Sequence, residues 1–96
     1  MKHLLASNRF KKELKKLPSP DQEKTLNVLK GFLGSLNQQK PLSEGYGFKK
    51  IGENHYELRV DLKLRIVMRS EENNLICHLI GNHDNVEKYL KDYGNK

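Results

Sequence analysis

The sequence predicts an α+β fold in which an N-terminal helical hairpin packs on one face of a small, antiparallel-dominated sheet. Two patterns of apolar residues predict this fold. Residues 7–37 repeat leucine and phenylalanine at helical spacing, whereas residues 48–80 alternate apolar and polar side chains at a spacing of two. Because the helices come first and the strands follow in a run, the helices are expected on one side of the sheet. The 96 residues fit a single domain, residues 1–96.

The N-terminal half is expected to form a short strand and two helices. Residues 2–6 can form the strand, Ser7 is a suitable N-cap, and a helix follows through Lys16. The prolines at 18 and 20 end that helix and begin a second one, which runs to about Asn37. The second helix is predicted to bury a stripe formed by Leu26, Leu29, Leu33 and Leu36, with Val28 and Phe32 in support.

The C-terminal half is expected to form a loop, four strands and a short closing helix. Residues 38–47 form the loop and residues 48–52 the first strand. The next three strands are predicted to turn inward Tyr56, Leu58, Val60, Leu64, Ile66, Met68, Leu75, Cys77 and Leu79. Residues 61–63 and 70–74 turn the two hairpins, and residues 84–93 form the helix, which Asn82 or Asp84 can cap. The element order is therefore β-α-α-β-β-β-β followed by a short helix.

The opposite face of these strands carries arginines for which a small sheet has no evident structural need. Apolar residues must face apolar residues across a ladder, so Leu58 is expected opposite Ile66. That register places Arg59 opposite Arg65. Like charges in directly opposed positions are destabilising, and an anion between the two arginines would relieve the repulsion. The simpler alternative is that both side chains extend into solvent over the sheet.

Two histidines extend this arginine patch. If Ile66 faces Cys77 on the last strand, Arg65 faces His78. His83 follows the same strand in a Gly-Asn-His-Asp turn. Histidine can transfer protons near neutral pH, and arginine binds phosphate oxygens through its forked donors. The alternatives are an ordinary turn histidine at position 83 and a stacked strand histidine at position 78.

The charge distribution favours a nucleic-acid partner. The chain has 18 basic and 12 acidic residues, and residues 1–52 hold 11 of the basic ones against 4 acidic ones. A basic surface suits phosphate backbones, although many small domains are merely basic. The side chains considered as RNA contacts are Lys11, Lys12, Lys49, Lys50 and Arg69.

Several classes of protein are not expected. The single cysteine, Cys77, cannot form an internal disulfide and is expected to be buried. His78 and His83 have no further ligand at a recognisable spacing, so no metal site is predicted. No glycine-rich phosphate loop is present, so no nucleotide cofactor is expected. No secretion signal or membrane-length apolar run is visible, so the protein is expected in the cytoplasm.

Three segments share their order and spacing with a known family. They are SNRFKKELKKL at 7–17, YELRV with LRIVMR at 56–69, and LIGNHD at 79–84. Together they span nearly the whole chain, and in this order they resemble the RelE/ParE superfamily of toxins from bacterial toxin–antitoxin pairs. The resemblance implies a small basic toxin that is neutralised by a cognate antitoxin. It also implies either cleavage of mRNA, usually on the ribosome, in the RelE branch, or inhibition of DNA gyrase in the ParE branch.

The resemblance also implies roles for individual residues. Arg65 matches the arginine of the family's central strand, and His83 matches a position at which relatives have a catalytic histidine or an arginine. Arg59 matches a basic position of the preceding strand. The chain departs from the family at Glu87, where many relatives have an aromatic residue.

The leading hypothesis is an mRNA endoribonuclease toxin that works by acid–base catalysis without a metal. Arg59 and Arg65 would bind the phosphate, His83 would transfer a proton, and His78 would transfer the second one. The alternatives are a gyrase inhibitor that acts by protein binding alone and a nucleic-acid-binding domain without catalysis. An antitoxin helix or extended segment with acidic residues is expected to lie across the basic surface.

Overall fold

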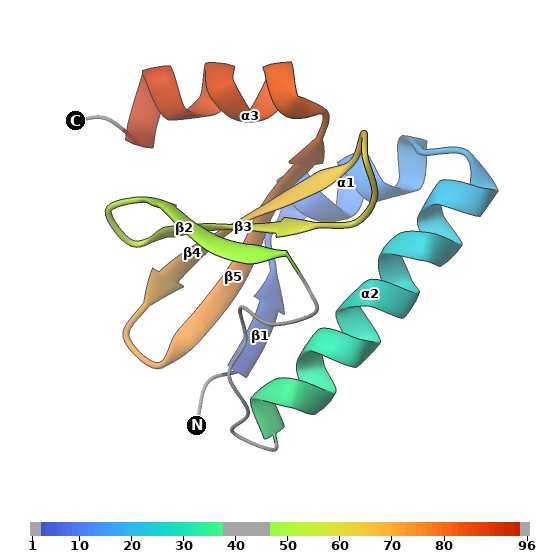
Figure 1. Cartoon of the computed structure of the whole chain (residues 1–96), viewed down its shortest axis with the longest axis horizontal. Helices are drawn as coiled ribbons and strands as arrows, with labels where there is room; N and C mark the ends of the chain where they lie inside the picture. Colours follow the sequence, from blue (N-terminus) through green and yellow to red (C-terminus); the bar gives the residue numbers. More distant parts are fainter. Residues whose placement is uncertain (1–2, 38–46, 95–96) are drawn as a thin grey trace.

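The computed structural model describes residues 3–37 and 47–94 and confirms the predicted α+β fold (Figure 1). The expected loop over residues 38–46 lies outside the described residues. The N-terminal elements are β1 (His3–Ala6), α1 (Asn8–Lys16) and α2 (Ser19–Asn37). The remaining strands are β2 (Phe48–Gly52), β3 (His55–Arg59), β4 (Arg65–Glu71) and β5 (Asn74–Gly81). The chain continues in α3 (His83–Tyr89) and a π-helical turn, η1 (Leu90–Gly94).

The five strands form one mixed sheet in the order β1-β5-β4-β3-β2. β1 runs parallel to β5, and the other neighbours are antiparallel. The ladder between β4 and β5 continues to the pair Glu71–Asn74, so the second hairpin turns on two residues rather than on the predicted five. Glu72 adopts a left-handed φ of 52° at this tight turn.

The helical hairpin covers one face of the sheet, as predicted. Ser7 caps α1 by accepting a hydrogen bond from the Phe10 amide, which fixes the entry of the helix beside β5. The Gln22 side chain donates to the carbonyl of Leu17 at 2.8 Å and so ties α2 to the end of α1. The main core lies between this hairpin and the sheet and contains Phe10, Phe32, Leu36, Leu58, Ile66, Met68, Leu75, Cys77 and Ile80.

The predicted core stripe of α2 is confirmed at Leu29 and Leu36 and wrong at Leu26 and Leu33. Leu26 and Leu33 are 47% and 40% exposed, whereas Thr25 and Phe32 are fully buried. Both stripes satisfy helical spacing, so the spacing alone could not choose between them. The structure buries Phe32, the largest apolar side chain of the helix, rather than Leu33. The Phe32 ring packs on Phe48 of β2, with ring centroids 5.0 Å apart.

The second face of the sheet is not fully open, because α3 and η1 pack across its centre. Val67 and Leu79 form the floor of a second core, and Val86 and Tyr89 of α3 cover them. In Figure 1 the sheet separates α3 from α2, so the molecule has three layers. Along β4, Arg65 and Arg69 share this face with Val67, and they lie on either side of it.

A β-bulge explains how this second core arises. Val67 pairs with Leu79 and Met68 pairs with Cys77, so His78 is an extra residue between them. The extra residue reverses the alternation, which turns Leu79 toward α3 and Ile80 toward the helical hairpin. The prediction that Leu79 shares a face with Leu75 and Cys77 is therefore wrong.

Candidate functional site

The predicted arginine pair lies at one end of the α3-covered face. Arg59 pairs directly with Arg65, which confirms that register. Gly81 of β5 lies on the other side of Arg65, and His83 follows two residues later as the first residue of α3. We call Glu57, Arg59, Arg65 and His83 the arginine end.

Glu57 holds Arg65 in place at the arginine end. The Arg65 guanidinium donates to the Glu57 carboxylate at 2.7 Å, and the two side chains are only 16% and 5% exposed. Arg65 Nε is buried and finds no partner among the described residues, and such orphaned donors are uncommon outside functional sites. Removing Arg65 would leave a buried carboxylate unpaired, which typically costs about 3–5 kcal/mol. A variant at position 65 therefore tests stability as well as chemistry.

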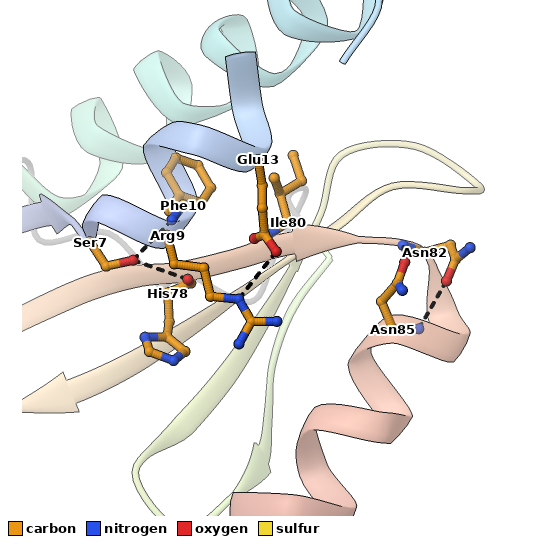
Figure 2. Close-up of polar contacts among 8 residues, drawn as sticks. All are labelled: Ser7, Arg9, Phe10, Glu13, His78, Ile80, Asn82 and Asn85. Carbon is orange, nitrogen blue, oxygen red and sulfur yellow. Dashed lines mark hydrogen bonds and ion pairs between the residues drawn. The ribbon is translucent and has the colours of Figure 1, made fainter. Parts of the chain in front are cut away.

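The turn before α3 presents His83 to solvent. Asn82 caps the helix, since its side chain accepts from the Asn85 amide while the Asn85 side chain accepts from the Asn82 amide (Figure 2). Asn82, rather than Asp84, is thus the cap. A side chain at position 81 would meet Asn85 Oδ1 at 2.7 Å, so the capping box requires glycine there.

The His83 ring is paired with a carboxylate on its own helix. His83 Nε2 lies 2.8 Å from Glu87 Oε1, and both side chains are 60% exposed. A carboxylate on one ring nitrogen orients the imidazole and leaves the other nitrogen for a substrate. Glu87 stands where many members of the resembled family have an aromatic residue. Here its carboxylate is the partner of the His83 ring, a contact that the sequence did not predict.

His78 does not lie opposite Arg65, so this part of the prediction is wrong. Arg65 pairs with Gly81, three residues beyond the predicted partner. The two-residue turn shifts the register by two residues relative to the prediction, and the bulge adds the third. His78 instead lies near Tyr89, with ring centroids 5.2 Å apart. The two predicted histidines are therefore at opposite ends of α3, His83 as its first residue and His78 beside its last residue, Tyr89.

His78 lines an open cavity of about 470 Å³ at the other end of the face. Its walls are Arg9 of α1, His55 of β3, Arg69 of β4, His78 of β5 and Tyr89 of α3. We call these five residues the histidine cleft. Tyr89 is buried, and its hydroxyl oxygen lies 2.8 Å from His55 Nε2. Burial, followed by repulsion from Arg69, Arg9 and His55, lowers the pKa of His78.

The predicted lysine contacts are distributed over both faces. Lys49 pairs with Glu57 and therefore shares the face of the arginine end, whereas Lys50 pairs with Tyr56 on the face of the helical hairpin. Lys11 and Lys12 are exposed on α1. Of the five predicted contacts, Arg69 is the one that joins the histidine cleft.

Sequence reasoning missed His55, Tyr89 and Glu57 as members of these clusters, although signals for two of them were present. The register that pairs Leu58 with Ile66 also pairs His55 with Arg69. His55 lies three residues before Leu58, and Arg69 lies three residues after Ile66. Tyr89 lies three residues after Val86 and so shares its buried helix face. No pattern in the sequence indicated that Glu57 would be buried.

The described residues form a small three-layer α+β domain, and solved toxin structures have the same fold. No family model and no curated protein matches the sequence. RelE in the RelB–RelE antitoxin–toxin complex from Methanococcus jannaschii is 21% identical, with a TM-score of 0.67 over 88% of this chain and 96% of that chain. YafQ in the E. coli DinJ–YafQ complex is 19% identical, with a TM-score of 0.66 over 90% and 98%.

A metal-bound toxin from Helicobacter pylori is 22% identical, with a TM-score of 0.65 over 90% of this chain and 99% of that one. The chain therefore has the RelE-like toxin fold, as its sequence segments predicted. The described residues bring together no group of three or more His, Cys, Asp or Glu side chains that could hold a metal ion. Among the helices in the described part of the chain, none has the length and apolar character to cross a membrane.

Proposed function

We propose that this protein is the toxin of a toxin–antitoxin pair and that it cleaves mRNA, with the ribosome as the place of action. The observation that carries the proposal is the arginine end. Two arginines from adjacent strands lie opposite one another there, and an exposed histidine with a carboxylate partner follows at the same end of the sheet. The RelE-like fold supports the assignment to toxins.

The proposed reaction is transfer of the phosphodiester to the neighbouring 2′-hydroxyl. The 2′-oxygen forms a bond to phosphorus as its proton leaves, and the bond from phosphorus to the 5′-oxygen breaks as that oxygen takes up a proton. Arg59 and Arg65 bind the phosphate oxygens, on which negative charge increases in the transition state. His83 transfers one of the two protons while Glu87 orients its ring.

Glu57 is a positioning residue in this proposal. Its carboxylate fixes the direction of the Arg65 guanidinium, and because it is buried it does not itself reach the substrate. The contact uses one terminal nitrogen of Arg65, which leaves the other for a phosphate oxygen. His78 is not assigned a proton-transfer role, because the observed register of β4 and β5 places Gly81, and not His78, opposite Arg65.

The proposed partner is an antitoxin that supplies acidic residues to the basic surface. The similar RelE and YafQ chains were solved with RelB and DinJ respectively. For this chain, a helix or extended segment laid across the α3-covered face would neutralise both arginines of the arginine end.

The test is growth arrest upon expression from a tightly controlled promoter, with cellular transcripts mapped for new 5′ ends. Wild type is compared with His83→Ala, and His3→Ala is the matched control because His3 is also exposed but lies on β1. We expect arrest and new ends within coding regions for wild type and His3→Ala. Loss of acid–base catalysis should reduce cleavage about 10²–10⁴-fold in His83→Ala.

Other outcomes distinguish the alternative functions. Arrest with intact transcripts in wild type and in His83→Ala would exclude the nuclease and lead to a gyrase supercoiling assay. Purified protein that binds RNA without cleaving it, in the presence and absence of ribosomes, would instead indicate a binding domain without catalysis.

A further inference from the structure

The histidine cleft gathers four basic side chains at a position remote from the arginine end. Arg9, His55, Arg69 and His78 come from α1, β3, β4 and β5, and so four separate elements direct a basic group into one cavity. Arg65 and Arg69 are four residues apart on β4, which at about 3.3 Å per residue separates the two ends by about 13 Å. Of the buried residues of the second core, which are Val67, Leu79, Val86 and Tyr89, Tyr89 is the one that also lines the cleft.

The acidic partners of the cleft arginines lie at its margins. Arg9 Nε donates to Glu13 at 3.1 Å, and the other oxygen of Glu13 accepts from the Ile80 amide (Figure 2). Arg69 donates to Glu71 through one terminal nitrogen at 2.9 Å, in a pair that is 41% and 49% exposed. Exposed pairs of this kind contribute little and are readily exchanged for another anion.

The cleft is also held in shape before any ligand arrives. The Ser7 hydroxyl donates to the His78 carbonyl at 3.0 Å, which fixes the bulge against the start of α1. Figure 2 shows the side chains of Arg9 and His78 on the same side of β5. On the opposite wall, the contact between His55 and the Tyr89 hydroxyl anchors the end of α3.

A groove connects the cleft with the beginning of α3. A second cavity, of about 320 Å³, shares Arg9 and Tyr89 with the cleft and extends between α1 and α3 to Asn85. Asn85 belongs to the capping box that presents His83. Lys88 lines the groove as a further cation, and Glu13 and Asp92 are its acidic residues.

We propose that the histidine cleft is a phosphate-binding subsite that takes the backbone of single-stranded RNA, a few nucleotides from the phosphate at the arginine end, with the α1–α3 groove as the path between them. The proposal rests on the proposed function for the identity of the RNA strand. A backbone phosphate would accept from Arg9 and Arg69 at once and would neutralise the repulsion that these arginines exert on His78.

The test uses the full chain and a 5′-labelled hexanucleotide of 2′-O-methyl RNA, which lacks the hydroxyl needed for cleavage. Binding is measured by fluorescence anisotropy at several salt concentrations for wild type, Arg69→Gln and Arg69→Lys. Lys30→Gln removes one charge from an exposed position on α2 and is the matched control. Thermal unfolding of each variant verifies that the fold is retained.

We expect Arg69→Gln to weaken binding roughly tenfold. It should also reduce the slope of log K against log salt by about 0.7, the value for one phosphate contact with a single strand. Arg69→Lys should keep most of the slope, and Lys30→Gln should match wild type. Equal affinity and slope in Arg69→Gln and Lys30→Gln would overturn the proposal.

A second measurement separates RNA from a free anion. The His78 ring resonances, assigned with His78→Gln, should respond to the hexanucleotide at concentrations far below those needed with inorganic phosphate. A response to inorganic phosphate alone would overturn the assignment to RNA.

Failure of this subsite and failure of the proposed function give different results. Cleavage that depends on His83 but is unchanged in Arg69→Gln would refute the subsite and leave the nuclease intact. Binding that depends on Arg69, with no cleavage on or off the ribosome, would refute the nuclease and leave the subsite intact.

Discussion

His78 shows how strongly the position of one residue on a strand decides its chemistry. The tight turn between β4 and β5, together with the bulge, moves it away from the predicted pairing with Arg65, and it lies instead beside Arg69. Desolvation is the first cause of its lowered pKa, and the nearby cations add to it. His78 is thus mainly neutral at neutral pH, and the arginines that lower its pKa are the groups in the cleft that attract an anion.

The lowered pKa of His78 predicts a loss of stability in mild acid. The ordinary pKa is 6.5, and the folded value lies below it, so the unfolded chain takes up a proton first as the pH falls. The free energy of unfolding is therefore unaffected by His78 above about pH 6.5, and it decreases below that pH as the unfolded chain takes up the proton. The groups facing His78 are Arg9, Arg69, His55 and Tyr89, with Glu13 opposing the shift.

We expect urea unfolding between pH 8 and pH 5 to show this decrease in wild type and a smaller one in His78→Gln. His3→Gln controls for the loss of an exposed histidine. Parallel curves for wild type and His78→Gln would mean that another group causes the decrease.

Cys77 is predicted to be inert while the protein is folded. Burial raises the pKa of its thiol to about 12 from a usual 9.0, so the thiolate is roughly a thousandfold rarer than in an exposed cysteine. Iodoacetamide at pH 8 should modify the protein in concentrated urea but hardly at all in buffer, as measured by mass spectrometry. Rapid modification in buffer would show that β5 opens locally.

At the scale of elements, the hairpin of β3 and β4 could be predicted and the pairing of β5 could not. Leu58 lies between Glu57 and Arg59, so shifting the register by one residue would turn these charged side chains toward the helical hairpin. In β5 the residues Leu79 and Ile80 are both apolar, and the sequence allows either of them to face the helical hairpin. The bulge turns Ile80 toward the helical hairpin and Leu79 toward α3.

The docking of α3 depends on a small apolar contact, since Val86 and Tyr89 are its buried residues. Val86→Ala removes two buried methyl-group equivalents, at about 0.8 kcal/mol each, and should destabilise the docked helix by about 1.5 kcal/mol. We expect amide hydrogen exchange to accelerate in α3 with a much smaller effect in the ladder of β3 and β4. Equal acceleration in both would show that the helix and the sheet unfold as one unit.

At the scale of the molecule, the net charge of +6 predicts a basic surface for an anionic partner but not the location of that surface. The structure divides α1 into two sides around its buried Phe10. Lys12 lies three residues after Arg9 and so shares the side of α1 that carries Arg9, whereas Lys11 lies two residues after it on a different side. Both lysines were predicted from the sequence as RNA contacts, and helix geometry now distinguishes them.

Lys12→Gln should lower the salt slope of hexanucleotide binding by about 0.7, and Lys11→Gln should leave it close to wild type. The two variants change the same charge on the same helix, so they separate a specific path from general attraction. Equal effects would favour a diffuse electrostatic interaction over the α1–α3 groove.

The extra residue in β5 also has a consequence for how this chain is matched to others. An alignment with any protein whose last strand is regular needs a one-residue gap inside that strand, a place where gaps are usually penalised. Without the gap, each residue after the bulge, including Leu79, Ile80 and His83, would be aligned with a residue one position away from its structural equivalent. Part of the distance between this sequence and similar folds can therefore come from a shift in register rather than from a change in residue type.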